Sequence, residues 1–379
     1  MMARLEGICA INMGQSPDSS TYNEDGNGLP FFQGNADFGE IYPAVRMWCS
    51  EPTKIAREKD ILISVRAPIG ALNIANCECC IGRGLAALTV NEDICAQKYL
   101  WHALSGKVDE LNSKGTGSTF KAINKKTLSE TEIPLPPIDE QHKIAAVLDK
   151  VSDLIAKRQQ QLDKLDEMIK ARFMEIFGDS ETNTKNWRVL PMSKICSVGS
   201  SKRIYQSEQS SSGVPFWRIS DLTSLITTGT VTPELYIPEE RYKELKTQGQ
   251  VPAPGDILIT SRGTLGQCYI VKVNDRFYFQ DGMISWLSGY MDGVTPLYIS
   301  YLFTMPGFRK QIDSMQAGST VAYLSITMIK KLKVMLPDIE SQQQFASFVS
   351  KTEKTKITIS RSLEKLETLK KALMQEYFG

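Results

Sequence analysis

An internal repeat constrains this chain more than any other feature of its sequence. The segment Gly117-Ser118-Thr119 recurs as Gly318-Ser319-Thr320, and the same offset of 201 residues carries the match without a gap over residues 117–178 and 318–379. Apolar, proline and glutamine positions coincide along it, including Gln141 with Gln342. An ungapped match of this length predicts a duplicated supersecondary unit.

Upstream of this repeat the match is looser and needs gaps. Residues 60–66 (DILISVR) resemble residues 256–262 (DILITSR), and a glycine follows each segment four residues later. We therefore predict a globular unit over 1–138, a helix over 139–178, a second globular unit over 179–338 and a helix over 339–379. Two copies that share a scaffold but differ in surface are expected to perform one task on two different targets.

The two segments 139–177 and 339–378 are predicted to be long helices. Neither contains proline or glycine, and each is followed by a glycine, a common helix stop. A helix of about 39 residues is roughly 58 Å long, longer than either globular unit. The narrow apolar stripe on each helix, broken by polar residues such as Arg158 and Lys356, predicts that the two pair as an antiparallel coiled coil. The alternative is that each helix packs only on its own domain.

The residues predicted to form the coiled coil recur at spacings of three and four. They are Ile144, Leu148, Val151, Ile155, Leu162, Leu165 and Ile169 in the first helix, and Phe345, Val349, Ile359, Leu363, Leu366 and Leu373 in the second. Leu369 is also assigned to the apolar stripe of the second helix.

Both globular units have the pattern of mixed α/β domains, so the fold class is α+β. Residues 60–65 and 256–261 are predicted to be buried strands, and residues 270–273, 276–279 and 283–287 continue the strand pattern in the second unit. Residues 99–111 and 297–315 are predicted to be helical. Gly, Asn, Ser and Pro are dense between these elements, which predicts long loops of the kind that carry binding residues.

Composition excludes several classes of protein. The chain of 379 residues is long enough for two domains. It has no apolar run of the roughly 18 residues that a membrane span needs, and its N-terminus lacks the pattern of a signal peptide, so we expect a cytoplasmic protein whose eight cysteines are reduced. The net charge of +1 is not that of a protein that holds DNA by charge alone.

No motif in the sequence supports catalysis. The two histidines, His102 and His142, are expected to be structural, and the cluster of Cys77, Cys79 and Cys80 lacks a second ligand pair at zinc spacing. There is no phosphate-binding loop, and Gly82-Arg83-Gly84 is a lone GxG without a nucleotide-binding context. We therefore expect a non-catalytic chain that binds no metal or cofactor of its own.

Arg66 and Arg262 are the leading candidates for DNA contact, because each follows a predicted strand in both copies. Arginine can hold a phosphate or bind guanine bidentately. The alternative is a buried structural ion pair. Further candidates lie on predicted loops, where solvated side chains and turn caps are the alternatives: Gln15, Gln33, Ser118, Thr119, Lys121, Lys202, Arg203, Arg218, Ser319 and Thr320.

These motifs together resemble the specificity subunits of type I restriction–modification systems. The resemblance rests on residues 12–17 (NMGQSP), residues 30–34 (PFFQG), the two Asp-Ile-Leu-Ile segments, and Gly-Ser-Thr leading through Leu-Pro-Pro-Ile into a long helix. It covers nearly the whole chain. Residues 199–203 (GSSKR) stand in place of residues 14–17 (GQSP) in the second copy, which is a departure from the family's opening motif.

The resemblance implies two target recognition domains that each read one half of a split double-stranded DNA sequence. The helices would be spacers that fix the gap and dock two methyltransferase (modification) subunits, and restriction subunits would complete an ATP-driven nuclease. S-adenosylmethionine, ATP and Mg²⁺ would belong to those partners. Two other interpretations remain: a coiled-coil adaptor that binds only proteins, and a DNA-modifying enzyme, which the missing cofactor motifs disfavour.

Overall fold

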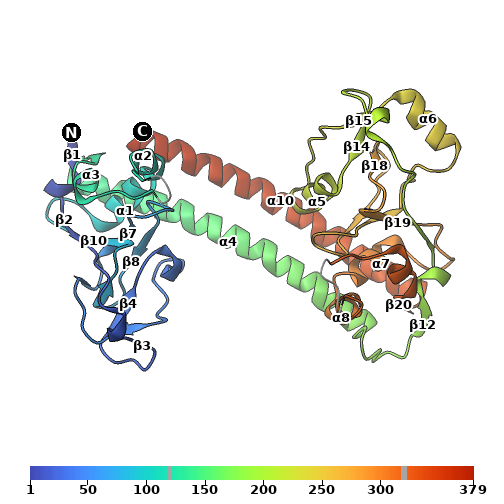
Figure 1. Cartoon of the computed structure of the whole chain (residues 1–379), viewed down its shortest axis with the longest axis horizontal. Coiled ribbons are helices and arrows are strands. Elements are labelled where there is room, and N and C mark those ends of the chain that lie inside the picture. Colours follow the sequence, from blue (N-terminus) through green and yellow to red (C-terminus); the bar gives the residue numbers. More distant parts are fainter. Residues whose placement is uncertain (118–120, 317–321) are drawn as a thin grey trace. The chain divides into compact units, whose positions relative to one another are not determined.

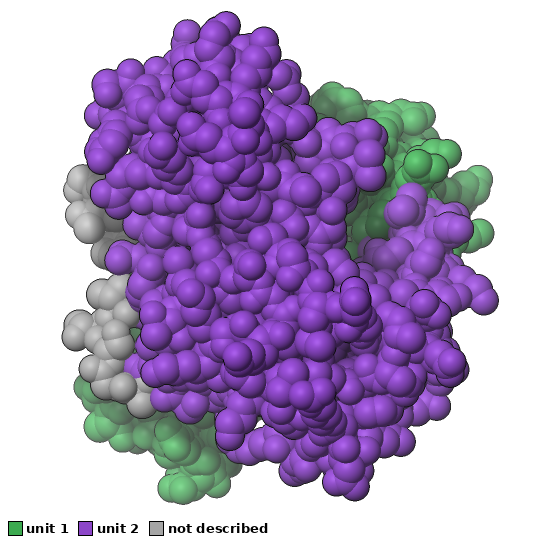
Figure 2. All heavy atoms as spheres, turned by 90° about the vertical axis from the view of Figure 1, so that its right-hand side faces the viewer, with its two compact units in different colours: residues 1–161, 359–379 green, residues 162–358 purple. Residues whose placement is uncertain are grey.

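The computed structural model of the chain describes residues 1–117, 121–316 and 322–379. It contains two compact units, one formed by Met1–Gln161 with Ile359–Gly379 and the other by Leu162–Thr358 (Figures 1 and 2). The boundaries fall inside the two long helices. Each unit therefore combines one globular domain with part of both helices.

The first unit is built on a four-stranded antiparallel sheet. Its strand order is β2 (Cys9–Met13), β10 (Leu85–Val90), β7 (Ile61–Ser64) and β8 (Leu72–Ile74). A second, mixed sheet contains β3 (Tyr22–Asn23), β5 (Trp48–Cys49), β4 (Leu29–Phe32), β9 (Cys79–Ile81) and β6 (Ile55–Ala56), and β1 (Met2–Arg4) pairs with β11 (Glu132–Pro134). The helices of the domain are α1 (Gln97–Ser105), α2 (Val108–Ser113) and α3 (Lys125–Ser129).

The second unit repeats this scaffold. Its four-stranded sheet has the same order, β13 (Ser197–Gly199), β19 (Ile284–Ser288), β16 (Ile257–Thr260) and β17 (Cys268–Ile270), and β12 (Arg188–Pro191) pairs with β20 (Lys333–Leu336). The second sheet has three strands, β15 (Tyr236–Ile237), β14 (Val214–Trp217) and β18 (Tyr278–Phe279). The helices are α5 (Ile219–Thr228), α6 (Glu239–Thr247), α7 (Pro296–Leu302), α8 (Pro306–Ser314) and α9 (Ile326–Lys331).

The central strands β7 and β16 are buried on both faces, as the continuous apolar runs predict. Alternate residues of a strand point to opposite faces, so Ile61 and Ile63 join the main core of the first unit while Leu62 joins a smaller core. In the second unit Leu258 likewise lies in a different cluster from its neighbours. This explains why an alternating pattern is absent here.

The two long helices, α4 (Ile138–Phe177) and α10 (Ile339–Phe378), pack together in antiparallel fashion, which confirms the prediction (Figure 1). In the first unit Leu148 near the start of α4 shares a core with Phe378 at the end of α10. In the second unit the order is reversed, because Phe173 near the end of α4 lies 5.4 Å from Phe345 near the start of α10, measured between ring centroids.

The helical stripe is buried most deeply at its two ends. Ile144, Leu148, Val151, Ile169, Phe345 and Val349 are buried. Half-buried positions fill the middle, namely Ile155, Leu162, Leu165, Ile359, Leu363, Leu366 and Leu373. The placement of Leu369 on the stripe is wrong, because it is 46% exposed. On a helix of 3.6 residues per turn, Leu373 stays close in direction to Leu366, whereas Leu369 is rotated about 60° away.

Three element predictions in the globular domains are wrong. Residues 99–111 form two helices because α1 ends at Gly106, and residues 297–315 form two because Pro306 opens α8. The predicted strand over 270–273 stops at Ile270. The Asp275 carboxylate accepts the Lys272 N–H at 2.7 Å and turns the chain there. The helices α5 and α6 were not predicted.

A buried glutamine fixes the start of each long helix to its domain. The Gln141 amide accepts the Ala96 N–H (2.9 Å) and donates to the carbonyls of Ile94 (3.1 Å) and Pro136 (2.8 Å). At the matching position of the repeat, the Gln342 amide makes the equivalent bonds to Thr295, Gly293 and Pro337. In each copy, one glutamine side chain bonds backbone groups of both a loop and the residues before the helix. The same residue type therefore fixes the direction of the helix relative to its domain in both copies.

We expect Gln342→Ala to lower the free energy of unfolding by about 1–3 kcal/mol, because it leaves the half-buried Thr295 N–H and two carbonyls without a partner. Gln342 is 1% exposed. The neighbouring exposed Gln343 provides the matched control Gln343→Ala, which should leave stability nearly unchanged. Urea unfolding followed by circular dichroism measures both, and equal effects would contradict the role given to Gln342.

Candidate nucleic-acid interface

Arg66 and Arg262 lie in matching turns that follow β7 and β16. The hydroxyl of the last strand residue, Ser64 or Thr260, donates to a backbone carbonyl four residues on and accepts an N–H seven residues on. A glycine with positive φ, Gly70 or Gly266, stands in each turn. The two turns therefore present their arginines from the same local structure.

Both arginines are exposed. Neither forms an ion pair within the part of the chain that the structure describes, so the alternative of a buried structural ion pair is wrong. The Arg262 guanidinium carbon lies 5.3 Å from the ring centroid of Tyr323, in cation–π geometry. Both guanidinium groups are available to a ligand from solvent.

In the first unit, four loops meet around residues 82–84 and the turn that carries Arg66. The Gly84 N–H donates to the Gln33 carbonyl (3.1 Å), and the Gly84 carbonyl accepts the N–H of the residue before Arg66 (2.9 Å). The Gln15 N–H donates to the last residue of β9 (3.0 Å), and the Lys121 carbonyl accepts the N–H of the residue after Arg66 (3.0 Å). All four side chains are exposed. We call Gln15, Gln33, Arg66 and Lys121, with residues 82–84, the first loop cluster.

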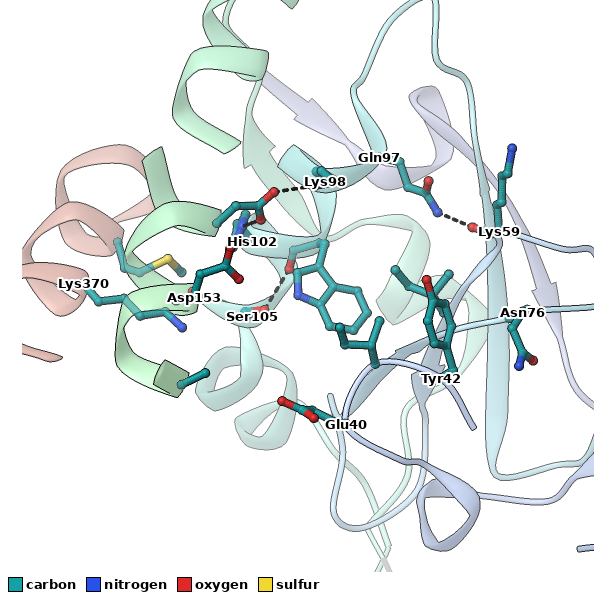
Figure 3. Close-up of a pocket in the computed structure, with 18 of the residues that line it drawn as sticks. Glu40, Tyr42, Lys59, Asn76, Gln97, Lys98, His102, Ser105, Asp153 and Lys370 are labelled. Carbon is teal, nitrogen blue, oxygen red and sulfur yellow. Dashed lines mark hydrogen bonds and ion pairs between the residues drawn. The ribbon is translucent and has the colours of Figure 1, made fainter. Parts of the chain in front are cut away.

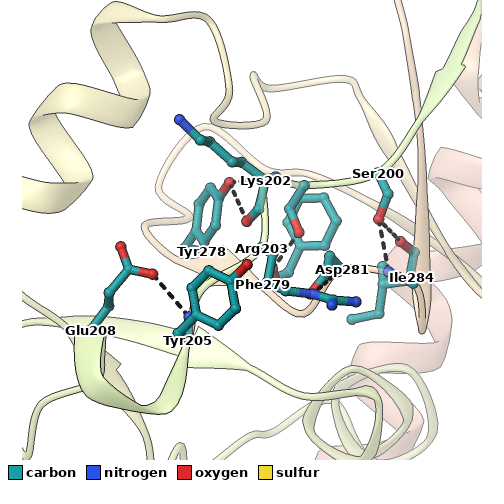
Figure 4. Close-up of polar contacts among 11 residues, drawn as sticks. Ser200, Lys202, Arg203, Tyr205, Glu208, Tyr278, Phe279, Asp281 and Ile284 are labelled. Atoms are coloured by element: carbon teal, nitrogen blue, oxygen red, sulfur yellow. Dashed lines mark hydrogen bonds and ion pairs between the residues drawn. The ribbon is translucent and has the colours of Figure 1, made fainter.

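The second unit gathers its loops around residues 280–283 in the same way. The Ser261 N–H donates to the Met283 carbonyl (2.9 Å), and the Gln280 N–H donates to the residue before Arg218 (2.9 Å). The Ser200 hydroxyl donates to the Ile284 carbonyl (2.8 Å), which ties the loop after β13 to the same place (Figure 4). We call Lys202, Arg203, Arg218 and Arg262, with residues 280–283, the second loop cluster.

The strand register corrects the alignment of the two opening loops. Through their shared partner strands, Asn12 and Gly199 occupy the same step of the sheet relative to Leu62 and Leu258. Gly199 therefore takes the place of Asn12 rather than Gly14, and the sequence alignment was wrong by two positions. Counting forward from this step, Lys202 stands in the place of Gln15, and Arg203 in the place of Ser16.

Gln33 and Arg218 are also matching positions, each directly after a strand that pairs in parallel. Their backbone N–H groups both donate to a carboxylate, Asp37 or Asp221, at 2.8 Å. The Arg218 guanidinium also bonds Glu234 at 2.8 Å, which raises the pKa of Arg218. This arginine is therefore already engaged by acidic side chains, unlike Arg66.

The remaining four candidates cannot be assigned to a cluster. Ser118, Thr119, Ser319 and Thr320 lie outside the described residues. Two others that the sequence did not single out belong to the clusters, namely Arg83, which is exposed, and Asp281, which bonds Arg203 at 2.9 Å. The only sequence signal for Arg83 is its position between two glycines, in a lone GxG without a nucleotide-binding context.

The clusters offer the chemical groups that nucleic acids require. Exposed guanidinium and ammonium groups can neutralise phosphates, and arginine and glutamine side chains can donate to and accept from base edges in the major groove. The sequence pattern of the family described as Type I restriction modification DNA specificity domain matches residues 1–167 and again residues 184–370. The chain belongs to this type I DNA specificity family.

Relatives of the family resemble the chain over different lengths. The type I restriction enzyme MjaX specificity subunit of Methanocaldococcus jannaschii is 44% identical over 175 residues, which cover 46% of this chain and only 41% of that protein. The MjaIX specificity subunit of the same organism is 25% identical over 336 residues, 83% of this chain and 75% of that one. The crystal structure of a type I S subunit from M. genitalium shares the fold, with a TM-score of 0.61 at 15% identity, covering 100% of this chain and 96% of that one.

The cysteines of this chain form no disulfide within the described residues. All eight cysteines are free, and burial raises the pKa of the Cys79 thiol to about 12, which keeps it protonated and unreactive. Among the residues that the structure describes, no group of three or more His, Cys, Asp or Glu side chains could hold a metal ion. None of the helices in the described ranges combines the length and apolarity that a membrane crossing needs.

A cavity of about 720 Å³ lies in the first unit beside α1, α4 and α10, apart from the predicted DNA contacts (Figure 3). On its polar wall the Asp149 carboxylate bonds Lys98 (2.6 Å) and His102 (2.8 Å). Burial lowers the pKa of the His102 imidazole below its ordinary value of 6.5, despite the opposing hydrogen bond to Asp149. The neutral ring therefore donates its Nε2–H to Asp149 and ties α1 to α4.

The pKa of His102 predicts a pH dependence of stability. As pH falls through about 6.5, the unfolded chain takes up a proton at His102 before the folded chain does, so the free energy of unfolding decreases. We expect this decrease to be shallower in His102→Gln than in the wild type between about pH 7.5 and 5.5, in urea unfolding at a series of pH values. His142→Gln, at an exposed position of α4, is the matched control. Equal slopes for the wild type and His102→Gln would contradict a buried neutral imidazole.

Proposed function

We propose that each globular domain reads one half of a split double-stranded DNA target, through its loop cluster. The observation that carries this proposal is the comparison of the two clusters. The same scaffold presents Arg66 and Arg262 in matching turns, yet it presents Gln15 where the other copy has Lys202, and Gln33 where the other has Arg218. A shared frame with different contact residues suits two readers of different sequences.

The shared and the differing residues have different tasks in this proposal. A residue common to both readers cannot specify different bases, so Arg66 and Arg262 hold phosphates and set the register on the duplex. The differing residues reach base edges, where the major groove distinguishes all four base pairs. With a net charge of +1, the chain supplies few phosphate contacts, and partner subunits supply the remainder.

The paired helices set the distance between the half-sites and dock the partners. The starts and ends of α4 and α10 are packed in the same way in the two copies. The chain therefore offers two equivalent surfaces, one for each of two methyltransferase subunits. Restriction subunits complete the nuclease. S-adenosylmethionine, ATP and Mg²⁺ are held by these partners, and the specificity chain itself performs no chemistry.

Mapping of methylated bases across the genome, with and without the gene for this chain, tests the proposal. We expect deletion to abolish methylation of one split, asymmetric motif. Exchanging residues 1–137 for the matching segment of a relative should change one half of that motif only. An unchanged methylome, with the methyltransferase demonstrably expressed, would favour instead an adaptor that binds only proteins. A change in both halves after the exchange would refute independent readers.

The gap between the half-sites should follow the length of the helices. Asp166 of α4 pairs with Lys356 of α10 at 2.7 Å, which defines the opposite positions. Deleting residues 155–161 together with 361–367 removes one heptad from each helix, or about 10 Å of length. We expect the methylated motif to keep both half-sites while the gap between them becomes shorter. Deleting only residues 155–161 breaks the pairing and should abolish methylation. An unchanged gap in the double deletion would contradict the spacer role.

A further inference from the structure

The loop clusters differ in which loop carries the positive charge nearest their centre. In the first unit the loop after β2 is uncharged at Gln15 and Ser16, and the neighbouring loop carries Arg83. The Arg83 N–H donates to the Ser16 hydroxyl at 3.3 Å, so these two loops touch. In the second unit the matching loop after β13 carries Arg203, and the neighbouring loop carries Asp281. The arginine therefore lies on the neighbouring loop in the first unit, and on the loop after the first strand of the four-stranded sheet in the second.

Arg203 is held in a defined orientation by Asp281. Its Nε donates to the Asp281 carboxylate at 2.9 Å, and the Arg203 side chain is 65% exposed whereas that of Asp281 is 21% exposed (Figure 4). The hydrogen bond to the carboxylate is made by Nε, and the two terminal nitrogens make no hydrogen bond within the described part of the chain. A guanidinium presented in this way retains the fork that bonds O6 and N7 of guanine.

The other cations of the second loop cluster are less suited to this task. Lys202 is a point charge without a fork, and its ammonium group points away from Arg203 in Figure 4. The Arg218 guanidinium is engaged by Glu234 at 2.8 Å and lies 3.6 Å from Asp221. Arg262 has a counterpart in the first unit and therefore cannot distinguish the two half-sites.

Arg83 has a comparably fixed backbone. A Cβ atom on Gly84 would lie 2.4 Å from the Gln33 carbonyl oxygen, and one on Gly82 would lie 3.0 Å from the Gln33 Cα. The glycines on both sides of Arg83 thus allow a close approach that larger residues would prevent. Within the described residues the Arg83 guanidinium takes part in no ion pair, so it is free to meet a base edge.

We propose that Arg203 and Arg83 are specificity-determining residues, each of which reads a guanine in its own half-site, and that Asp281 is the positioning residue for Arg203. This inference rests on the proposed function and adds to it the residues and the base. The two domains read their half-sites with guanidinium groups that enter from opposite loops of one scaffold.

The test maps methylated bases in strains that carry single substitutions in the complete system. Arg203→Ala should relax the requirement for guanine at one position of one half-site, by about 5- to 150-fold in discrimination. Arg203→Lys should relax the same position, because lysine keeps the charge but lacks the fork. Arg83→Ala should relax one position of the other half-site. Asp281→Asn should relax the Arg203 position by a smaller factor, while Asp281→Glu should restore part of the discrimination.

Arg262→Ala is the matched control in the second loop cluster. It should lower methylation of all targets without changing the motif, since its counterpart Arg66 shows that the position is shared. Thermal melting of each purified variant establishes that it folds. The inference is overturned if Arg203→Ala and Arg203→Lys leave the motif unchanged, if they lower methylation uniformly as Arg262→Ala does, or if either changes both half-sites.

Failure of this inference can be distinguished from failure of the proposed function. If the wild-type strain loses a split motif on deletion of the gene but the Arg203 and Arg83 variants keep it intact, the domains read DNA with other residues. If the wild-type motif does not depend on the chain at all, the proposed function fails, and the inference fails with it.

Discussion

Buried aromatic residues at the helix ends are the contacts on which the rest of the structure depends. The ring of Phe177, at the end of α4, lies 4.9 Å from that of Tyr298 in the second unit, and Phe378, at the end of α10, lies 5.2 Å from Tyr99 in the first. The Tyr99 and Tyr298 hydroxyls also donate to strands β11 and β20, which lead into the long helices. Each of the two tyrosines thus connects its own domain to the strand before one long helix and to the end of a long helix. The last residues of the chain complete the core of its first domain.

This double anchoring explains the pattern of similarity between the two copies. The ends of the long helices are packed alike in both copies, through the pairs Gln141 and Gln342, and Phe177 and Phe378. Substitution or a change of length at these positions would open a buried core. The side chains that define the loop clusters are exposed or half-buried, and their positions are set mainly by backbone hydrogen bonds, so substitutions there disturb the core less. The matching ends of the two helices therefore stayed alike without gaps, whereas the loop clusters could diverge in residue and in length.

The same distinction decides what could be predicted from the sequence. Helices α4 and α10 and strands β7 and β16 have strong local signals, namely the absence of helix breakers and short buried apolar runs. The place of Gly199 could not be found in that way, because it depends on pairing with Trp286, far along the chain. The exposure of Arg66 and the closeness of Arg203 to Asp281 likewise follow from tertiary contacts. Composition gave no sign of where charge would gather.

Under the proposed function, the local pairing of charges would let a chain with a net charge of +1 discriminate between DNA sequences. Asp281 beside Arg203 and Glu234 beside Arg218 reduce the attraction of the second loop cluster for any phosphate, because the carboxylates repel the DNA backbone. They cost affinity that is independent of sequence. A guanidinium fixed by a carboxylate loses less side-chain entropy when it meets a matching base edge. Such an arrangement favours the ratio of specific to non-specific binding, which is the quantity that matters among the many competing sites of a genome.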